Sequence, residues 1–86
     1  MKVARIAALV LLISVPINAV ANCVDINSAS FQELRLIIHI DEDRAGQIMS
    51  LRQQRPFVSV DDLGRVRGIA RARLADIHRQ GLACVR

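Results

Sequence analysis

The chain contains no tryptophan or tyrosine, only two phenylalanines, and a single lysine, Lys2. Beyond residue 2 it therefore has no amine side chain that could form a Schiff base with a carbonyl substrate. Its two cysteines and two histidines stand singly, without the Cys-x-x-Cys or His-x-x-x-His spacing of a zinc site. No Ser/His/Asp set and no pair of carboxylates indicates an active site either. The sequence thus predicts a protein that is not an enzyme and holds neither metal nor cofactor.

Long apolar runs are also lacking. The longest, residues 6–15, contains one serine and is ended by Pro16, whereas a membrane-spanning helix needs about 20 apolar residues. A short basic start, an apolar middle and the small residues Ala19-Val20-Ala21 are typical of a secretory signal peptide. We therefore expect residues 1–21 to be removed, and residues 22–86 to form one domain in a bacterial periplasm, without a membrane anchor.

The two cysteines, Cys23 and Cys84, bracket that domain. In an oxidising compartment, cysteines so placed are expected to form a disulfide. A domain this small has a marginal core, and closing so long a loop stabilises the fold by roughly 4 kcal/mol. Lipidation of Cys23 is an alternative to cleavage after Ala21, because the preceding residues are similar to a lipobox, but Asn22 stands where that motif has a small residue. We therefore predict a structural Cys23–Cys84 bond.

The charge is placed unevenly along the expected domain. Residues 22–56 hold five acids and four arginines, whereas residues 57–86 hold three acids and six arginines. The net charge of the domain is +2, which is the whole-chain value of +4 without Lys2 and Arg5. The basic face is therefore expected in the second half.

The two halves repeat one pattern at an offset of 29 residues. Ser30, Leu34, Ile40, Arg44 and Ile48 recur as Ser59, Leu63, Ile69, Arg73 and Ile77. Both copies open with Ser-x-x-acid, a capping-box pattern at a helix start. A repeat of this period is typical of a supersecondary unit used twice, and each unit here is predicted to be helix, tight turn, helix.

Apolar spacing predicts four helices, over residues 31–38, 42–54, 60–66 and 71–80. Pro56 should end the second helix and Gly81 the fourth. We expect Phe31 and Ile38 to be buried with the first helix, and Phe57 to lie centrally between the two units. Because strand-type alternation is nearly absent, the fold is predicted to be all-α.

Several stretches of this pattern resemble the ComEA-type tandem helix-hairpin-helix family. They are Ile26-Asn27-Ser28-Ala29-Ser30, Pro56-Phe57-Val58-Ser59-Val60-Asp61-Asp62-Leu63 and Val66-Arg67-Gly68-Ile69. The resemblance covers essentially the whole expected domain and implies a compact (helix-hairpin-helix)₂ fold. It also implies binding of double-stranded DNA without sequence preference. The implied role is periplasmic uptake of external DNA in natural transformation, with proteins of the uptake machinery as partners.

The second turn, Gly68-Ile69-Ala70, is the predicted phosphate site. Gly68 can adopt positive φ, and the unpaired amides at the start of the following helix favour an anion. The predicted DNA-binding residues are Arg65, Arg67, Gly68, Ile69, Ala70, Arg71 and Arg73, with a weaker contribution from Arg44 of the first unit. The alternative is an ordinary turn between helices with solvated arginines.

The first turn, His39-Ile40-Asp41, departs from the family pattern of Gly-apolar-Gly and is followed by Glu42 and Asp43. Three acids at this helix start would repel a phosphate. The acidic turn therefore favours a second hypothesis, a protein-interaction module that has lost DNA binding and faces an arginine-rich partner or a second copy. Since both phenylalanines are expected to be buried, no aromatic platform remains for stacking single-stranded bases.

Intact mass spectrometry of the periplasmic protein tests the processing and the disulfide together. We expect the mass of residues 22–86, with alkylation at two thiols only after reduction. Two free thiols before reduction would contradict the Cys23–Cys84 bond, and a lipid mass on Cys23 would contradict the cleavage site.

Overall fold

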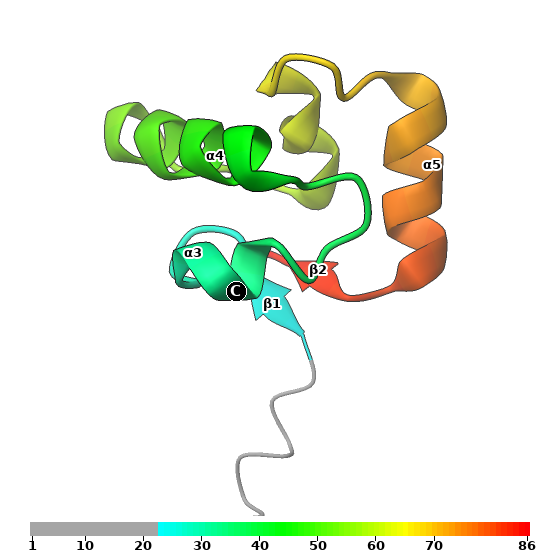
Figure 1. Cartoon of the computed structure of the whole chain (residues 1–86), viewed down its shortest axis with the longest axis horizontal. Helices are drawn as coiled ribbons and strands as arrows, with labels where there is room; N and C mark the ends of the chain where they lie inside the picture. The colour runs from blue at the N-terminus through cyan, green and yellow to red at the C-terminus, as the bar shows by residue number, and fades with distance from the viewer. Residues whose placement is uncertain (1–22) are drawn as a thin grey trace, which may run out of the picture.

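The computed structural model describes residues 23–86 (Figure 1). The expected signal peptide, residues 1–21, lies outside the described residues. The elements are β1 (Val24–Asp25), α3 (Phe31–Leu34), α4 (Glu42–Gln54), the 3-10 helix η1 (Val60–Arg65), α5 (Arg71–Gln80) and β2 (Ala83–Cys84). The predicted all-α class with four short helices is confirmed, with one small two-stranded sheet added. In the described part of the chain, no helix is long and apolar enough to cross a membrane.

The first helix, α3, begins as predicted but ends earlier. The Ser30 hydroxyl accepts a hydrogen bond from the Glu33 amide, and the Glu33 carboxylate accepts one from the Ser30 amide, so the capping box is formed. The helix expected over residues 31–38 stops at Leu34, and the chain continues in tight turns closed by bonds to the third residue back. These turns direct Ile37 inward and leave Ile38, expected inside, 40% exposed.

The second helix of each unit has the predicted bounds. Helix α4 ends at Gln54, because Arg55 before Pro56 is extended, with φ −158° and ψ 122°. Helix α5 ends at Gln80, because Gly81 takes the left-handed conformation at φ 70°. Local stop signals therefore set the ends of both helices.

The first helix of the second unit, η1, differs from the expected α-helix over residues 60–66. Ser59 makes no side-chain cap, and the Asp62 carboxylate instead accepts a hydrogen bond from the Val58 amide at 3.1 Å. The predicted second capping box is therefore wrong. The 3-10 winding repeats every three residues, which places Leu63 and Val66 on one side, and both are fully buried.

One core joins the two units, and positions equivalent in the repeat are buried alike. The pairs Leu34/Leu63, Ile37/Val66, Ile40/Ile69 and Ile48/Ile77 are all buried. Phe57 lies between the units as predicted and is also fully buried. The Asn27 amide group fixes its backbone, donating to the Phe57 carbonyl and accepting from the Phe57 amide, each at 2.8 Å. Phe31, expected inside, is only half-buried at the edge of this core.

The two ends of the domain lie side by side at the base of the molecule, where β1 and β2 meet (Figure 1). The strands are parallel, with Val24 opposite Ala83 and Asp25 opposite Cys84. Cys23 and Cys84 are joined by a disulfide with their Cα atoms 5.8 Å apart. The sheet and the disulfide therefore hold the two ends of the domain together.

Phe57→Ala is expected to lower the free energy of unfolding by about 3–5 kcal/mol, because it removes the largest fully buried side chain from the contact between the units. Denaturant unfolding measures this loss. The matched variant Phe31→Ala removes the other aromatic ring from a half-buried position and should cost clearly less. Equal losses for the two variants would contradict the central position of Phe57.

Candidate functional site

The two hairpin turns have the same backbone although their sequences differ. Gly68 has φ 91°, and His39, the equivalent residue of the first turn, has φ 70°. Ile40 and Ile69 follow these residues, and each donates its amide to the carbonyl three residues back, to Ile37 at 3.1 Å and to Val66 at 3.0 Å. The Ile69 amide is thus used within the turn, so our expectation that it faces a phosphate is not supported. The positive φ of His39 could not be read from the sequence.

An arginine braces each turn from the helix that follows it. In the first unit, Nη1 of Arg44 donates to the His39 carbonyl at 3.0 Å. In the second unit, Nη1 of the equivalent Arg73 donates to the Gly68 carbonyl at 2.8 Å. In both units the accepting carbonyl belongs to the residue with positive φ. The repeated arginine therefore has a structural role that its sequence position alone did not reveal.

Each turn is also held by the second helix of the other unit. Oε1 of Gln47, on α4, accepts from the Arg67 amide at 2.9 Å. In the same way Oε1 of Gln80, on α5, accepts from the Ile38 amide at 2.9 Å. Ile38 and Arg67 are equivalent in the repeat. Sequence reasoning missed both glutamines, for which the only signal was that they are polar residues on the helices that follow the turns.

Arg44 links the turns directly, because its Nε donates to the Arg67 carbonyl at 3.2 Å while its Nη1 holds the first turn. A Cβ added at Gly68 would lie 2.5 Å from Nη2 of Arg44, so glycine leaves room for the guanidinium. The Asp76 carboxylate makes the opposite link, with Oδ2 2.7 Å from Nε2 of His39. This hydrogen bond from His39, helped by Arg79, holds the pKa of Asp76 below its usual value. The two turns are therefore held to each other by hydrogen bonds that run in both directions between the units.

The helices that follow the two turns begin differently. Asp41 caps α4, and its Oδ1 accepts from the Arg44 amide at 3.0 Å, which also lowers the pKa of Asp41. Ala70 occupies the equivalent position before α5 and offers no side-chain cap. The first amides of an α-helix have no partner within the helix, and the helix dipole favours an anion beside them. The start of α5 can thus accept an external anion where the start of α4 already holds its own carboxylate.

Exposed arginines surround the start of α5. The turn at residues 66–70 leads into this helix at the top of the molecule in Figure 1. Arg67, Arg71 and Arg73 are all exposed there, and the first turn of α5 contains no acid. By contrast, the acids Glu42 and Asp43 occupy the first turn of α4.

Arg65 lies elsewhere, although the sequence placed it among the phosphate-binding residues. Its guanidinium carbon lies 4.4 Å from the centre of the Phe57 ring, and its Nη2 donates to the Arg55 carbonyl at 3.1 Å. An ion pair with Asp62 at 3.4 Å leaves the Arg65 side chain only 17% exposed. The side chain is engaged in packing between the units, so we assign it a structural role.

Of the predicted residues, the structure brings seven together at the second turn: Arg44, Arg67, Gly68, Ile69, Ala70, Arg71 and Arg73. Ile69 is buried and anchors the turn from within. Arg44 supports the turn indirectly, because its guanidinium donates to the carbonyls of His39 and Arg67. The amides at the start of α5 and the side chains of Arg67, Arg71 and Arg73 remain as the groups that can meet an anion.

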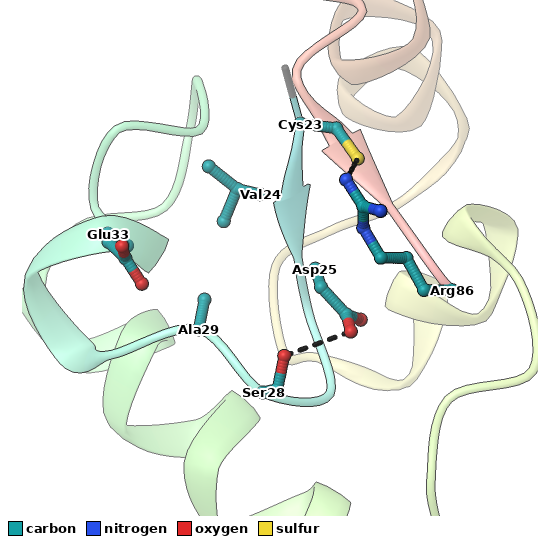
Figure 2. Close-up of a pocket in the computed structure, with 7 residues that line it drawn as sticks. All are labelled: Cys23, Val24, Asp25, Ser28, Ala29, Glu33 and Arg86. Carbon is teal, nitrogen blue, oxygen red and sulfur yellow. Dashed lines mark hydrogen bonds between the residues drawn. The ribbon is translucent and has the colours of Figure 1, made fainter. Parts of the chain in front are cut away.

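Neither of the two pockets described below is a better candidate for the functional site than the second turn. One cavity of about 220 Å³ lies beside the disulfide at the base of the molecule, and Figure 2 shows Arg86 there next to Cys23. Two polar groups that line this cavity are already paired with each other, because Oγ of Ser28 donates to the Asp25 carboxylate at 2.9 Å. A shallower groove of about 320 Å³, lined in part by Gln47 and Arg67, adjoins the second turn. Within residues 23–86, no three potential metal ligands come together.

Comparison with known proteins places these features in a family. The family model described as helix-hairpin-helix motif matches residues 20–80. A protein named Deoxyribonuclease from Thioalkalivibrio sp. (strain K90mix) is 43% identical over 65 residues. That stretch is 76% of this chain but only 17% of the relative, so the chain matches a small part of a much longer protein. No solved structure matches.

Gly68→Ala and Gly81→Ala form a matched pair that tests the brace. Both glycines have positive φ, where alanine costs about 1–2 kcal/mol. Nothing lies within 4 Å of a Cβ at Gly81, whereas a Cβ at Gly68 would displace Arg44. Because a lost hydrogen bond costs about 1 kcal/mol, Gly68→Ala should lower the free energy of unfolding by about 1 kcal/mol more than Gly81→Ala. Denaturant unfolding of both variants measures the difference.

The same comparison in an Arg44→Met background is the control. With the guanidinium removed, the two alanine substitutions should cost nearly the same. A difference that persists without Arg44, or no difference in the wild-type background, would contradict the brace.

Proposed function

The chain belongs to the helix-hairpin-helix family, and from that premise we propose that it binds double-stranded DNA without sequence preference through its second turn. The observation that carries this proposal is the uncapped start of α5, surrounded by three exposed arginines. Backbone amides and guanidinium groups together make a site for one phosphate and its neighbours. Contacts to phosphates position a protein on DNA but do not read bases, so binding is independent of sequence.

The contribution of the two turns is unequal in this proposal. The second turn offers amides without a competing side chain, whereas the Asp41 carboxylate occupies the corresponding place in the first. Glu42 and Asp43 add two exposed negative charges there. A phosphate near the first turn would be repelled by about 1 kcal/mol per charge at 4 Å even in bulk water, and by more near the protein. The second turn therefore carries the DNA.

We further propose that the protein works in the periplasm and takes part in the uptake of external DNA. Support comes from the signal-peptide pattern of residues 1–21, from the disulfide at Cys23 and Cys84, and from the resemblance to ComEA-type proteins. A disulfide of this kind persists in oxidising compartments and is rare in the cytosol.

The role proposed is binding rather than cleavage. The relative named Deoxyribonuclease is matched over only 17% of its length, and the match of 65 residues is about as long as the helix-hairpin-helix region at residues 20–80 of this chain. A binding module used within a longer protein can also act as a separate chain, since function resides in the site and not in the fold.

A duplex-DNA titration at several salt concentrations tests the proposal. If two to four phosphates are engaged, the logarithm of the association constant should fall with that of the salt concentration, with a slope of about −2 to −4. Arg71→Ala should weaken binding to all sequences alike and make the slope shallower by up to about one unit. Arg73→Ala should do the same, although it also removes the brace on Gly68. DNA recovered after incubation with Mg²⁺ should be uncut.

Two control variants sharpen the result. Arg79→Ala removes an arginine from the far end of α5, where it is paired with Asp76, and should leave affinity nearly unchanged. Arg44→Ala should weaken binding with the slope unchanged, because it loosens the turn without removing a phosphate contact. A complete lack of salt-sensitive binding would contradict the proposal and favour the second hypothesis, a protein-interaction module. Cut DNA would contradict the non-catalytic role.

A further inference from the structure

The first turn presents a different surface on the same backbone. Where the second unit has Arg65 and Arg67, the equivalent residues of the first are Leu36 and Ile38, which are 62% and 40% exposed. Where the second unit has Arg71, the first has Glu42. At each of these positions the second unit has an arginine and the first has an apolar or an acidic side chain. We name the residues Leu36, Ile38, Asp41, Glu42 and Asp43 the first-hairpin surface.

The apolar part of this surface is held rigidly. Gln80, on α5, holds the backbone of residues 36–38 with two hydrogen bonds. Its Oε1 accepts from the Ile38 amide at 2.9 Å, and its Nε2 donates to the Leu36 carbonyl at 3.1 Å. Because the backbone at Leu36 and Ile38 is already held by these bonds, it loses little conformational entropy when another molecule covers the two side chains. The backbone that carries Leu36 and Ile38 is therefore already ordered before a partner binds to these side chains.

The acidic part of the surface has few internal partners. Asp41, Glu42 and Asp43 are all exposed, and none of them belongs to the ion pairs found among residues 23–86. Asp43 accepts a hydrogen bond only from the neutral amide of Gln47, at 3.0 Å. The charges of Arg44 and Arg35 both act on Asp41. With Arg44 and Arg35 counted against the three carboxylates, the surface keeps one uncompensated negative charge.

We propose that the first-hairpin surface docks a segment of another protein that carries apolar side chains next to arginine or lysine. Apolar side chains cover Leu36 and Ile38, and the cations pair with the carboxylates at the rim, which sets the orientation and speeds association. Nucleic acid and anionic lipid are disfavoured here, because both would bring negative charge against three carboxylates. The proposal does not depend on DNA binding by the second turn.

Selection from a library of random 12-residue peptides displayed on phage tests this assignment, using protein purified after expression of the full chain. Peptides that are enriched are synthesised with a fluorescent label, and their dissociation constants are measured by anisotropy in the absence of DNA. We expect the enriched peptides to combine apolar residues with at least two arginines or lysines. Their binding should weaken as salt is added.

Three variants locate the binding. Leu36→Arg and Glu42→Arg each install the residue that stands at the equivalent position of the second unit, and each should weaken peptide binding at least tenfold. Val58→Arg is the matched control, since Val58 is 76% exposed but lies outside the surface, and it should change binding less than twofold. All three positions are exposed, and circular dichroism checks that each variant is folded.

Other outcomes overturn the proposal. Enriched peptides without basic residues, peptides whose binding survives both Leu36→Arg and Glu42→Arg, or no enrichment at all would each contradict it. Sedimentation of the protein alone provides a separate check. A concentration-dependent dimer that Leu36→Arg disperses would assign the surface to a second copy of this chain and overturn docking of another protein.

Discussion

The structure depends on the Arg44 guanidinium, which joins the two hairpin turns. It donates to the carbonyl of His39 in its own turn and to the carbonyl of Arg67 in the other. Gly68 leaves space for the guanidinium, because it has no Cβ. Gln47 adds one hydrogen bond and Gln80 adds two, each reaching from its own unit to the turn of the other unit. Buried apolar pairs bring the units together, but these polar contacts fix how the turns are placed. A rigid pair of turns is what allows backbone amides to bind an anion without first being ordered.

A backbone fixed from within leaves the outward side chains free to differ. The first turn keeps the shape of the second with a histidine at φ 70°, because contacts to Arg44 and Asp76 hold it there. Its outer residues are apolar and acidic, while those of the second turn are basic. One fold can thus present two surfaces of opposite chemistry, of which one suits DNA and the other suits a protein. The relative's far greater length is consistent with a module that is used beside other parts.

Helix ends that depend on neighbouring residues could be predicted from the sequence. Contacts between residues that are distant in the sequence could not. Helices α4 and α5 end where predicted, because Pro56 and Gly81 act on the neighbouring backbone. The short α3 and the 3-10 winding of η1 arise from packing, since both turn residues such as Ile37 and Val66 inward at the expense of regular α-helix. Arg65 was misassigned because nothing in its own stretch showed that the Phe57 ring would lie beneath it. The glutamine braces were missed for the same reason.

The most direct test of unequal turns follows the backbone amides themselves during a titration with a short DNA duplex. In ¹H–¹⁵N NMR spectra, the amides of residues 71–73 at the start of α5 should shift progressively, while those of residues 42–44 at the start of α4 stay nearly fixed. Equal shifts at both helix starts would contradict the asymmetry. Shifts at the first turn alone would contradict the assignment of DNA to the second.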